Sequence, residues 1–201
     1  MFTIEKAASR QEFDAYIREN GPAWELPNFP WGSAPLKVCA EVRHDDANFY
    51  VCLRAYEKDP RITVFEPEGS VHLDSCMEFF FSPCPALRPD YFNLEANAAG
   101  TDKFDYGEGR HGRIQAEKFH GFEEMAAEVT PDYWQLLCTI PYAAIRAHAP
   151  EFEGKSGDMI RANIYRCGEL AGVKSFVTLF PIMVESPDYH RPEFFGKMIL
   201  A

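Results

Sequence analysis

The chain has few basic residues and lacks any long apolar run. Its 201 residues include 20 Lys and Arg against 31 Asp and Glu, which gives a formal net charge of −11. This balance argues against binding to nucleic-acid backbones or anionic membrane surfaces, because both need clustered cations. No stretch approaches the ~20 apolar residues of a membrane-spanning helix. The printed sequence also begins without the apolar segment of a signal peptide, so we expect a cytoplasmic protein.

The cysteines and histidines lack the spacing of a disulfide or zinc framework. Six cysteines occur without a Cys-x-x-Cys pair, so we expect reduced thiols. The histidines show neither His-x-His nor His-Glu-x-x-His spacing, and we expect no zinc site and no cofactor. Asp45 and Asp46 resemble a pair of calcium ligands, although consecutive acidic residues are also ordinary turn residues. A structural calcium ion therefore stays open as an alternative.

Aromatic residues and short alternating segments indicate a sheet protein. The chain contains 17 Phe, 9 Tyr and 3 Trp, and such side chains pack well on a pleated surface. Alternating apolar and polar residues predict a hairpin from 36–43 and 47–57. Eight further strands are predicted at 77–82, 91–98, 111–118, 125–130, 133–140, 159–166, 175–180 and 194–200.

This pattern of short strands predicts an all-β protein, an antiparallel β-sandwich of the jelly-roll kind. Two short helices are predicted beside it, at 10–20 and 141–145. We expect a single domain in which residues 1–35 form a helical and irregular lead-in that packs on residues 36–201.

Two predicted strands carry an uninterrupted polar row on one face. Alternate side chains of a strand point to opposite faces, so every second residue shares a face. The rows are Asn93, Glu95 and Asn97 in one strand and Arg161, Asn163 and Tyr165 in the other. A polar row on a sheet suits the recognition of hydroxyl groups, and two rows could line one groove.

The three tryptophans differ in their surroundings. Trp134 shares a strand face with Leu136 and Ile140, which predicts a position in the core. Trp24 and Trp31 lie in the lead-in, where either could fold over the rim of a groove or close the end of the sandwich.

Several segments, in the order in which they occur, resemble carbohydrate-binding module family 9. These segments are 44–51, 74–80, Trp134 followed by 140–142, 161–166 and 190–196, and the resemblance covers roughly residues 36–201. It implies a β-sandwich that binds a mono- or oligosaccharide without catalysis, sometimes with structural calcium. In the family, two aromatic side chains sandwich the sugar while Glu, Arg and Asn side chains bind its hydroxyl groups.

The resemblance and the polar rows together define the candidate site. One family stacking position, a Trp in glycan-binding members, is occupied by His72 here, and the other falls near 187–190, where Tyr189 is the aromatic candidate. Carboxylate, amide and guanidinium groups can pair with adjacent hydroxyls, and the arginines would also suit a phosphosugar. The candidate ligand-binding residues are His72, Glu78, Glu95, Asn97, Arg110, Arg161, Asn163, Arg166, Tyr189 and His190.

Other functions fit parts of the sequence. Glu78 and Glu95 could form the carboxylate pair of a glycan-cleaving enzyme, or could lie on a solvated outer face. A sandwich that binds haem needs a His and a Met ligand, which could be drawn from His72, His190, Met77 and Met183. A module that has lost sugar binding and contacts only other proteins is the remaining alternative.

Overall fold

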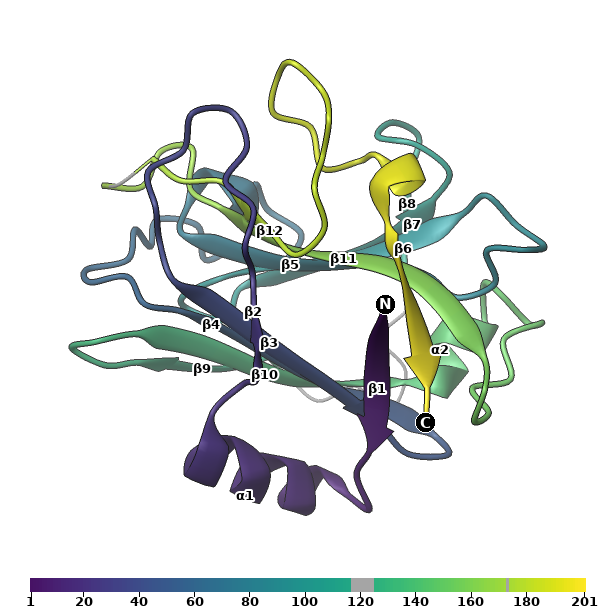
Figure 1. Ribbon diagram of the computed structural model, residues 1–201. Helices are drawn as coiled ribbons and strands as arrows, with labels where there is room; N and C mark the ends of the chain where they lie inside the picture. The colour runs from purple at the N-terminus through teal and green to yellow at the C-terminus, as the bar shows by residue number, and fades with distance from the viewer. Residues whose placement is uncertain (117–124, 173) are drawn as a thin grey trace.

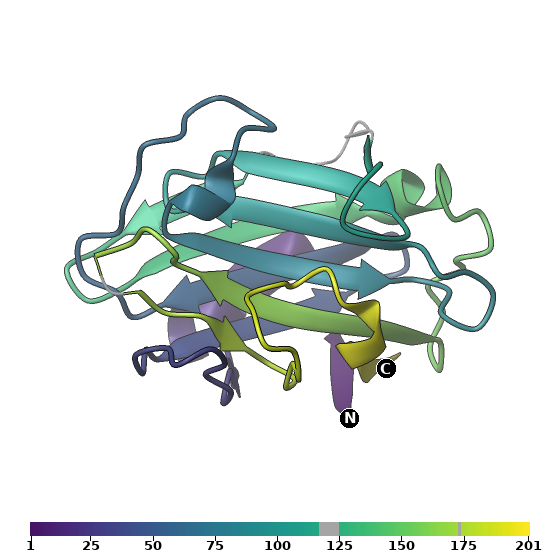
Figure 2. The same ribbon diagram turned by 90° about the horizontal axis from the view of Figure 1, so that it is seen from above.

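The computed structural model describes residues 1–116, 125–172 and 174–201. The 13 strands within these ranges form one continuous sheet that folds over on itself and gives two layers (Figure 1). The first layer contains β8 (Ile114–Gln115), β7 (Asp102–Gly107), β6 (Tyr91–Asn97), β5 (Cys76–Ser82), β11 (Met159–Cys167) and β13 (Gly196–Leu200), with β12 (Val177–Thr178) paired to β11. The second layer contains β3 (Val38–His44), β4 (Asn48–Ala55), β10 (Trp134–Pro141) and β9 (Ala126–Val129), with β2 (Trp24–Glu25) paired to β3. Figure 2, a view from above, shows the strands of the first layer side by side and in front of the second layer.

The N-terminal strand β1 (Phe2–Lys6) joins the two layers at one edge. It runs parallel to β13, with Phe2 opposite Met198, and parallel to β3, with Lys6 opposite His44. The other described strand pairings are antiparallel, so the sheet as a whole is mixed. The antiparallel prediction was therefore wrong for β1, a strand that the lead-in was not expected to contain.

Apolar side chains of both layers meet in one core. Met77, Phe79 and Phe81 of β5 point into it because they alternate with residues that face outward. Trp134 is fully buried in the same core, as its strand face predicts. The six cysteines are all free thiols. No helix among the described residues is long and apolar enough to cross a membrane.

Helix α1 (Arg10–Asn20) lies below the second layer, where the sequence predicted a helix at 10–20 (Figure 1). Ser9 caps its start by accepting a hydrogen bond from the Glu12 backbone N–H, and Gly21 ends it with a positive φ of 70°. Phe13 and Ile17 are buried against Tyr50 and Cys52 of β4. The apolar side of the helix thus covers the outer face of the second layer.

Shorter helices occur as α2 (Tyr142–Arg146), η1 (Val71–Leu73) and η2 (Pro192–Phe194). The segment 111–118 was predicted as one strand, but only β8 forms within it, and residues 117 and 118 lie outside the described part. Strand β7 was not predicted, although Phe104 and Tyr106 alternate with polar residues and are buried.

Candidate functional site

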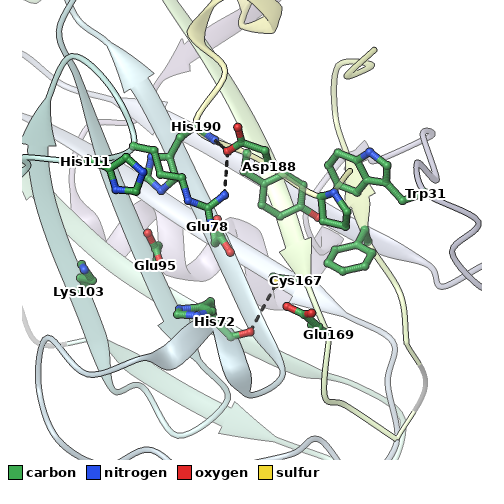
Figure 3. Close-up of a pocket in the computed structure, with 14 residues that line it drawn as sticks. Trp31, His72, Glu78, Glu95, Lys103, His111, Cys167, Glu169, Asp188 and His190 are labelled. Carbon is green, nitrogen blue, oxygen red and sulfur yellow. Dashed lines mark hydrogen bonds and ion pairs between the residues drawn. The ribbon is translucent and has the colours of Figure 1, made fainter. Parts of the chain in front are cut away.

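A cavity of about 230 Å³ opens on the outer face of the first layer. Strands β5 and β6 supply its floor, and loops around Trp31 and Asp188 contribute its walls (Figure 3). Arg110 also lines the cavity. Of the sequence candidates, the structure brings six to this cavity, namely His72, Glu78, Glu95, Arg110, Tyr189 and His190.

Glu78 and Glu95 form a carboxyl pair on the floor. They lie directly opposite each other in the β5–β6 register, and Tyr165 of β11 is opposite Glu78 on the other side. Both glutamates are almost fully buried, at 3% and 6% exposure. Burial raises the pKa of Glu78 well above its usual value, and repulsion from Glu95 raises it further. Burial also raises the pKa of Glu95, while a hydrogen bond from Asn93 opposes the shift.

The two carboxyl groups differ in their partners. Glu95 accepts a hydrogen bond of 2.7 Å from the Asn93 side-chain amide. No described residue donates a hydrogen bond to the Glu78 carboxyl group or forms an ion pair with it, and this group faces the cavity (Figure 3). A buried carboxyl group without an internal partner needs donors from water or a ligand.

Aromatic rings form one wall of the cavity. Tyr189 stacks on Tyr165 with ring centroids 4.1 Å apart, and Trp31 packs beside Tyr189 at 5.5 Å. Phe176 meets Trp31 edge to face at 5.4 Å. The Trp31 indole donates a 2.8 Å hydrogen bond to the Val184 carbonyl, which fixes its ring. Of the two possibilities left open for the lead-in tryptophans, Trp31 therefore lies at the rim of a cavity.

His190 lies at another side of the cavity and is neutral. Its Nδ1 is 2.8 Å from the Tyr91 hydroxyl, within hydrogen-bond distance. Burial lowers the pKa of His190 to about 3, with further lowering from the cations Arg113 and Arg110. At neutral pH the imidazole has one N–H donor and one acceptor nitrogen, which suits hydroxyl groups.

The basic residues of the cavity already have acidic partners. Lys103 on β7 pairs with Asp105 at 3.1 Å, and Arg110 pairs with Asp188 at 3.2 Å. Asp188 also accepts a hydrogen bond from the His190 backbone N–H. Asp188 therefore contacts both Arg110 and the backbone of His190 at the cavity.

His72 belongs to η1 and lines the cavity with an exposed side chain. Desolvation lowers the pKa of its imidazole, and the Lys103 charge lowers it further. The Cys167 thiol donates a hydrogen bond to the His72 carbonyl, which ties η1 to β11.

Eight cavity residues are not among the candidate ligand-binding residues, namely Trp31, Lys103, His111, Cys167, Glu169, Phe176, Pro187 and Asp188. Of these, the sequence offered a place at the rim of a groove for Trp31 alone. For Lys103 a signal existed, because it alternates with the buried Phe104 and so shares the outward face of a strand. Most of the others lie on loops, where no periodicity assigns a direction.

The side-chain amides of two candidates, Asn97 and Asn163, form hydrogen bonds within the protein and lie outside the cavity. Asn97 donates to the Val64 carbonyl and to Asp74, and its side-chain oxygen accepts from the backbone N–H groups of Ala99 and Thr101. These bonds use both donors and both lone pairs of the amide. Asn163 exchanges two hydrogen bonds with the backbone of Phe180, at 2.9 and 3.1 Å.

The two candidate arginines of β11 also lie outside the cavity. Arg161 donates to the carbonyls of Phe195 and Glu193 and so holds η2 and the residue that follows it. Arg166 is fully buried and donates to Glu57 at 2.6 Å and to the Ser175 carbonyl. It stands on the opposite face from Arg161 and Asn163, because it lies an odd number of positions from each of them along the strand.

The candidate calcium and haem ligands have other surroundings. Asp45 accepts hydrogen bonds from the backbone N–H groups of Ala47 and Asn48 and from the Tyr50 hydroxyl, so its carboxylate holds the β3–β4 turn. Among the described residues, no group of three or more metal-ligating side chains converges. Met77 packs in the core on the face opposite the cavity, so it cannot share a haem with His72 or His190.

A family model described as carbohydrate-binding family 9 matches residues 22–200. Among solved structures, a proposed carbohydrate-binding protein from Bacteroides uniformis is 22% identical, with a TM-score of 0.82. The match covers 100% of this chain and 99% of that one. No curated protein matches the chain.

Two further solved structures are carbohydrate-binding module family 9 domains from Caldicellulosiruptor kristjanssonii. One, in complex with glucose, is 12% identical with a TM-score of 0.69, and the match covers 100% of this chain and 95% of that chain. The other, in complex with cellotriose, is 13% identical with a TM-score of 0.67, and the match covers 99% of this chain and 92% of that chain. These similarities confirm the β-sandwich class.

Proposed function

Because the chain belongs to carbohydrate-binding family 9, we propose that its cavity holds one sugar unit of a mono- or oligosaccharide and that the protein binds this sugar without cleaving it. The observation that carries the proposal is the arrangement of the cavity: the aromatic wall of Trp31 and Tyr189 stands over the carboxyl floor of Glu78 and Glu95. Aromatic faces cover the C–H surface of a sugar ring, and carboxyl groups bind its hydroxyls.

The size of the cavity supports a single ring. Its volume of about 230 Å³ lies below the range of ~300 to 1,000 Å³ that encloses drug-sized ligands. A longer saccharide would therefore place one terminal unit inside and the remaining units over the mouth. Glucose and cellotriose, the ligands of two solved structures of the same family, are the first sugars to test.

The geometry of the carboxyl pair argues against glycoside cleavage. Glycosidases place two carboxyl groups about 5 to 10 Å apart on either side of the scissile bond. Glu78 and Glu95 are directly opposed on neighbouring strands, so both side chains rise from the same floor. They can contact the same face of a sugar but cannot flank a bond from two sides.

Isothermal titration calorimetry against glucose, cellobiose, cellotriose and xylobiose tests the proposal. We expect saturable binding of at least one sugar, which Trp31→Ala weakens about tenfold or more through loss of the aromatic wall. Phe29→Ala is the matched control, because Phe29 is 41% exposed in the same lead-in and does not line the cavity. Absence of binding to every sugar, or equal losses in both variants, would contradict the proposal.

A further inference from the structure

The charges that line the cavity are unevenly satisfied. Its two basic residues, Lys103 and Arg110, each form an ion pair with an aspartate. Its three glutamates, Glu78, Glu95 and Glu169, form no ion pair with any described residue. A ligand that enters therefore meets a surplus of carboxyl groups and no free cation among the described lining residues.

Glu78 distinguishes this cavity from a solvated acidic patch. Only 3% of the residue is exposed, and its side chain is aimed into the cavity from the middle of β5 (Figure 3). Its backbone is fixed by antiparallel neighbours on both sides, β6 and β11. The carboxyl group has no donor within the described protein, so its donors are water or a ligand that enters the cavity.

From this arrangement we infer that the preferred ligand is an amino sugar, whose ammonium group binds between Glu78 and Glu95. The inference rests on the sugar-binding function proposed above and names the class of sugar. A primary ammonium group carries three N–H donors and one positive charge. It can donate to both carboxyl groups at once, which a single hydroxyl with one donor cannot do.

Electrostatics favour the ammonium group over a hydroxyl at this position. Charge-assisted hydrogen bonds between ammonium and carboxylate are roughly twice as strong as neutral ones. Ionisation of two adjacent buried carboxyl groups is unfavourable unless a cation lies between them, because the two negative charges repel each other. Binding of the ammonium group supplies this cation, and the proton that the pair retains in the empty protein leaves to solvent. No bond forms or breaks in the ligand.

The aromatic wall is compatible with this orientation. Trp31 and Tyr189 belong to loops that line the cavity, so a ring that packs on them can direct one edge toward Glu78. His190 and the Lys103 and Arg110 side chains then lie within the same cavity for the remaining hydroxyls. Each cation lies beside an aspartate, Lys103 beside Asp105 and Arg110 beside Asp188, which Arg191 also contacts, and these carboxylates reduce the repulsion of the bound ammonium group.

Calorimetric titrations with D-glucosamine, D-glucose and N-acetyl-D-glucosamine at pH 6.5 test the inference. The three sugars share one ring but differ at a single substituent, which is cationic only in glucosamine at this pH. Because the position of the amino group in the ligand is open, 6-amino-6-deoxy-D-glucose is titrated as well. We expect one of the two amino sugars to bind about tenfold more tightly than glucose.

Two variants separate the carboxyl effect from other changes. Glu78→Gln keeps the size of the side chain but removes its charge, and we expect the preference for the amino sugar to fall to about one. Glu19→Gln is the control, because Glu19 is exposed on α1 at the other side of the sandwich and should keep the full preference.

The outcomes distinguish the inference from the function on which it rests. Glucose that binds as well as or better than both amino sugars would overturn the inference and leave the sugar-binding function intact. An amino-sugar preference that Glu78→Gln leaves unchanged would also overturn it, because the ammonium group would then bind elsewhere. Absence of binding by every sugar would overturn both.

Discussion

The ring of Tyr189 lies flat on the ring of Tyr165, with centroids 4.1 Å apart and planes inclined by 4°. This stack connects a loop that lines the cavity to strand β11 beneath it. The Tyr189 hydroxyl donates a 2.8 Å hydrogen bond to the Arg166 carbonyl of the same strand. The aromatic wall is therefore held rigidly before any ligand arrives.

Replacement of Tyr189 tests this wall. Tyr189→Phe keeps the stack and loses one hydrogen bond, at a cost of about 1 kcal/mol of unfolding free energy. Tyr189→Ala removes a buried ring and should cost about 3 to 5 kcal/mol. We expect sugar affinity to survive the first change and to be lost in the second. Urea denaturation and calorimetry measure the two effects, and a Phe variant that loses sugar binding would show that the hydroxyl, and not the ring, contacts the ligand.

Glu78→Gln should stabilise the protein increasingly as the pH rises. The pKa of Glu78 is raised in the folded state, whereas in the unfolded chain the group ionises near its ordinary value. The wild type therefore loses stability as the pH rises above about 4.5 and through the folded pKa, by up to about 1.4 kcal/mol per pH unit. The Gln variant escapes this loss. Melting temperatures of both proteins between pH 4 and 8 would contradict this expectation if their difference stayed constant.

His190 should give the opposite dependence. Its pKa is about 3 in the folded state, and it is near 6.5 when unfolded. The unfolded chain takes up a proton first as the pH falls, so stability is fully present above about 6.5 and declines below it. His190→Gln should abolish this part of the decline. Chemical denaturation of the two proteins between pH 4 and 7 is the measurement, and parallel pH profiles would count against a buried neutral imidazole.

The ion pair of Glu57 and Arg166 should support the fold and not the site. Glu57 also accepts hydrogen bonds from the Trp134 indole and the Ser75 hydroxyl, and it lies away from the cavity. Arg166→Met leaves a buried unpaired carboxylate and should cost about 3 to 5 kcal/mol. Below its lowered melting temperature, the variant should bind sugar with unchanged affinity. A strong loss of sugar affinity in a folded variant would contradict this prediction and show that Arg166 contributes to binding.

Alternation along the sequence predicted the face to which most strand side chains point, but it did not predict the groups with which they form hydrogen bonds. Alternation correctly placed Glu78 opposite Met77 and Phe79, because the pleat fixes which side chains share a face. The same rule shows that Arg166 cannot share a face with Asn163. Asn97 and Asn163 have the expected orientation, but their amide N–H groups donate to the carbonyls of Val64 and Phe180, which lie 33 and 17 residues away along the chain. Local patterns carry no information about such long-range contacts.

The lead-in, residues 1–35, shows that local patterns predict a helix better than a strand with distant partners. Helix α1 was predictable because its cap, its spacing of Phe13 and Ile17 and its terminal Gly21 are all local. Strand β1 was not predictable from local patterns. One parallel partner, β13, lies at the other end of the chain, and the other, β3, follows only after helix α1. Trp31 reaches the cavity through an irregular loop and a hydrogen bond to Val184, and no periodicity predicts that path.

The three tryptophans offer the most direct test of where a sugar binds. Trp31 lines the cavity, Trp24 packs beside Phe2, and Trp134 is buried in the core. In a two-dimensional ¹H–¹⁵N spectrum each indole N–H gives its own signal. We expect addition of the sugar with the highest affinity to shift the Trp31 signal and to leave those of Trp24 and Trp134 in place. A Trp31 signal that stays fixed with every sugar, up to its solubility limit, would contradict sugar binding in this cavity.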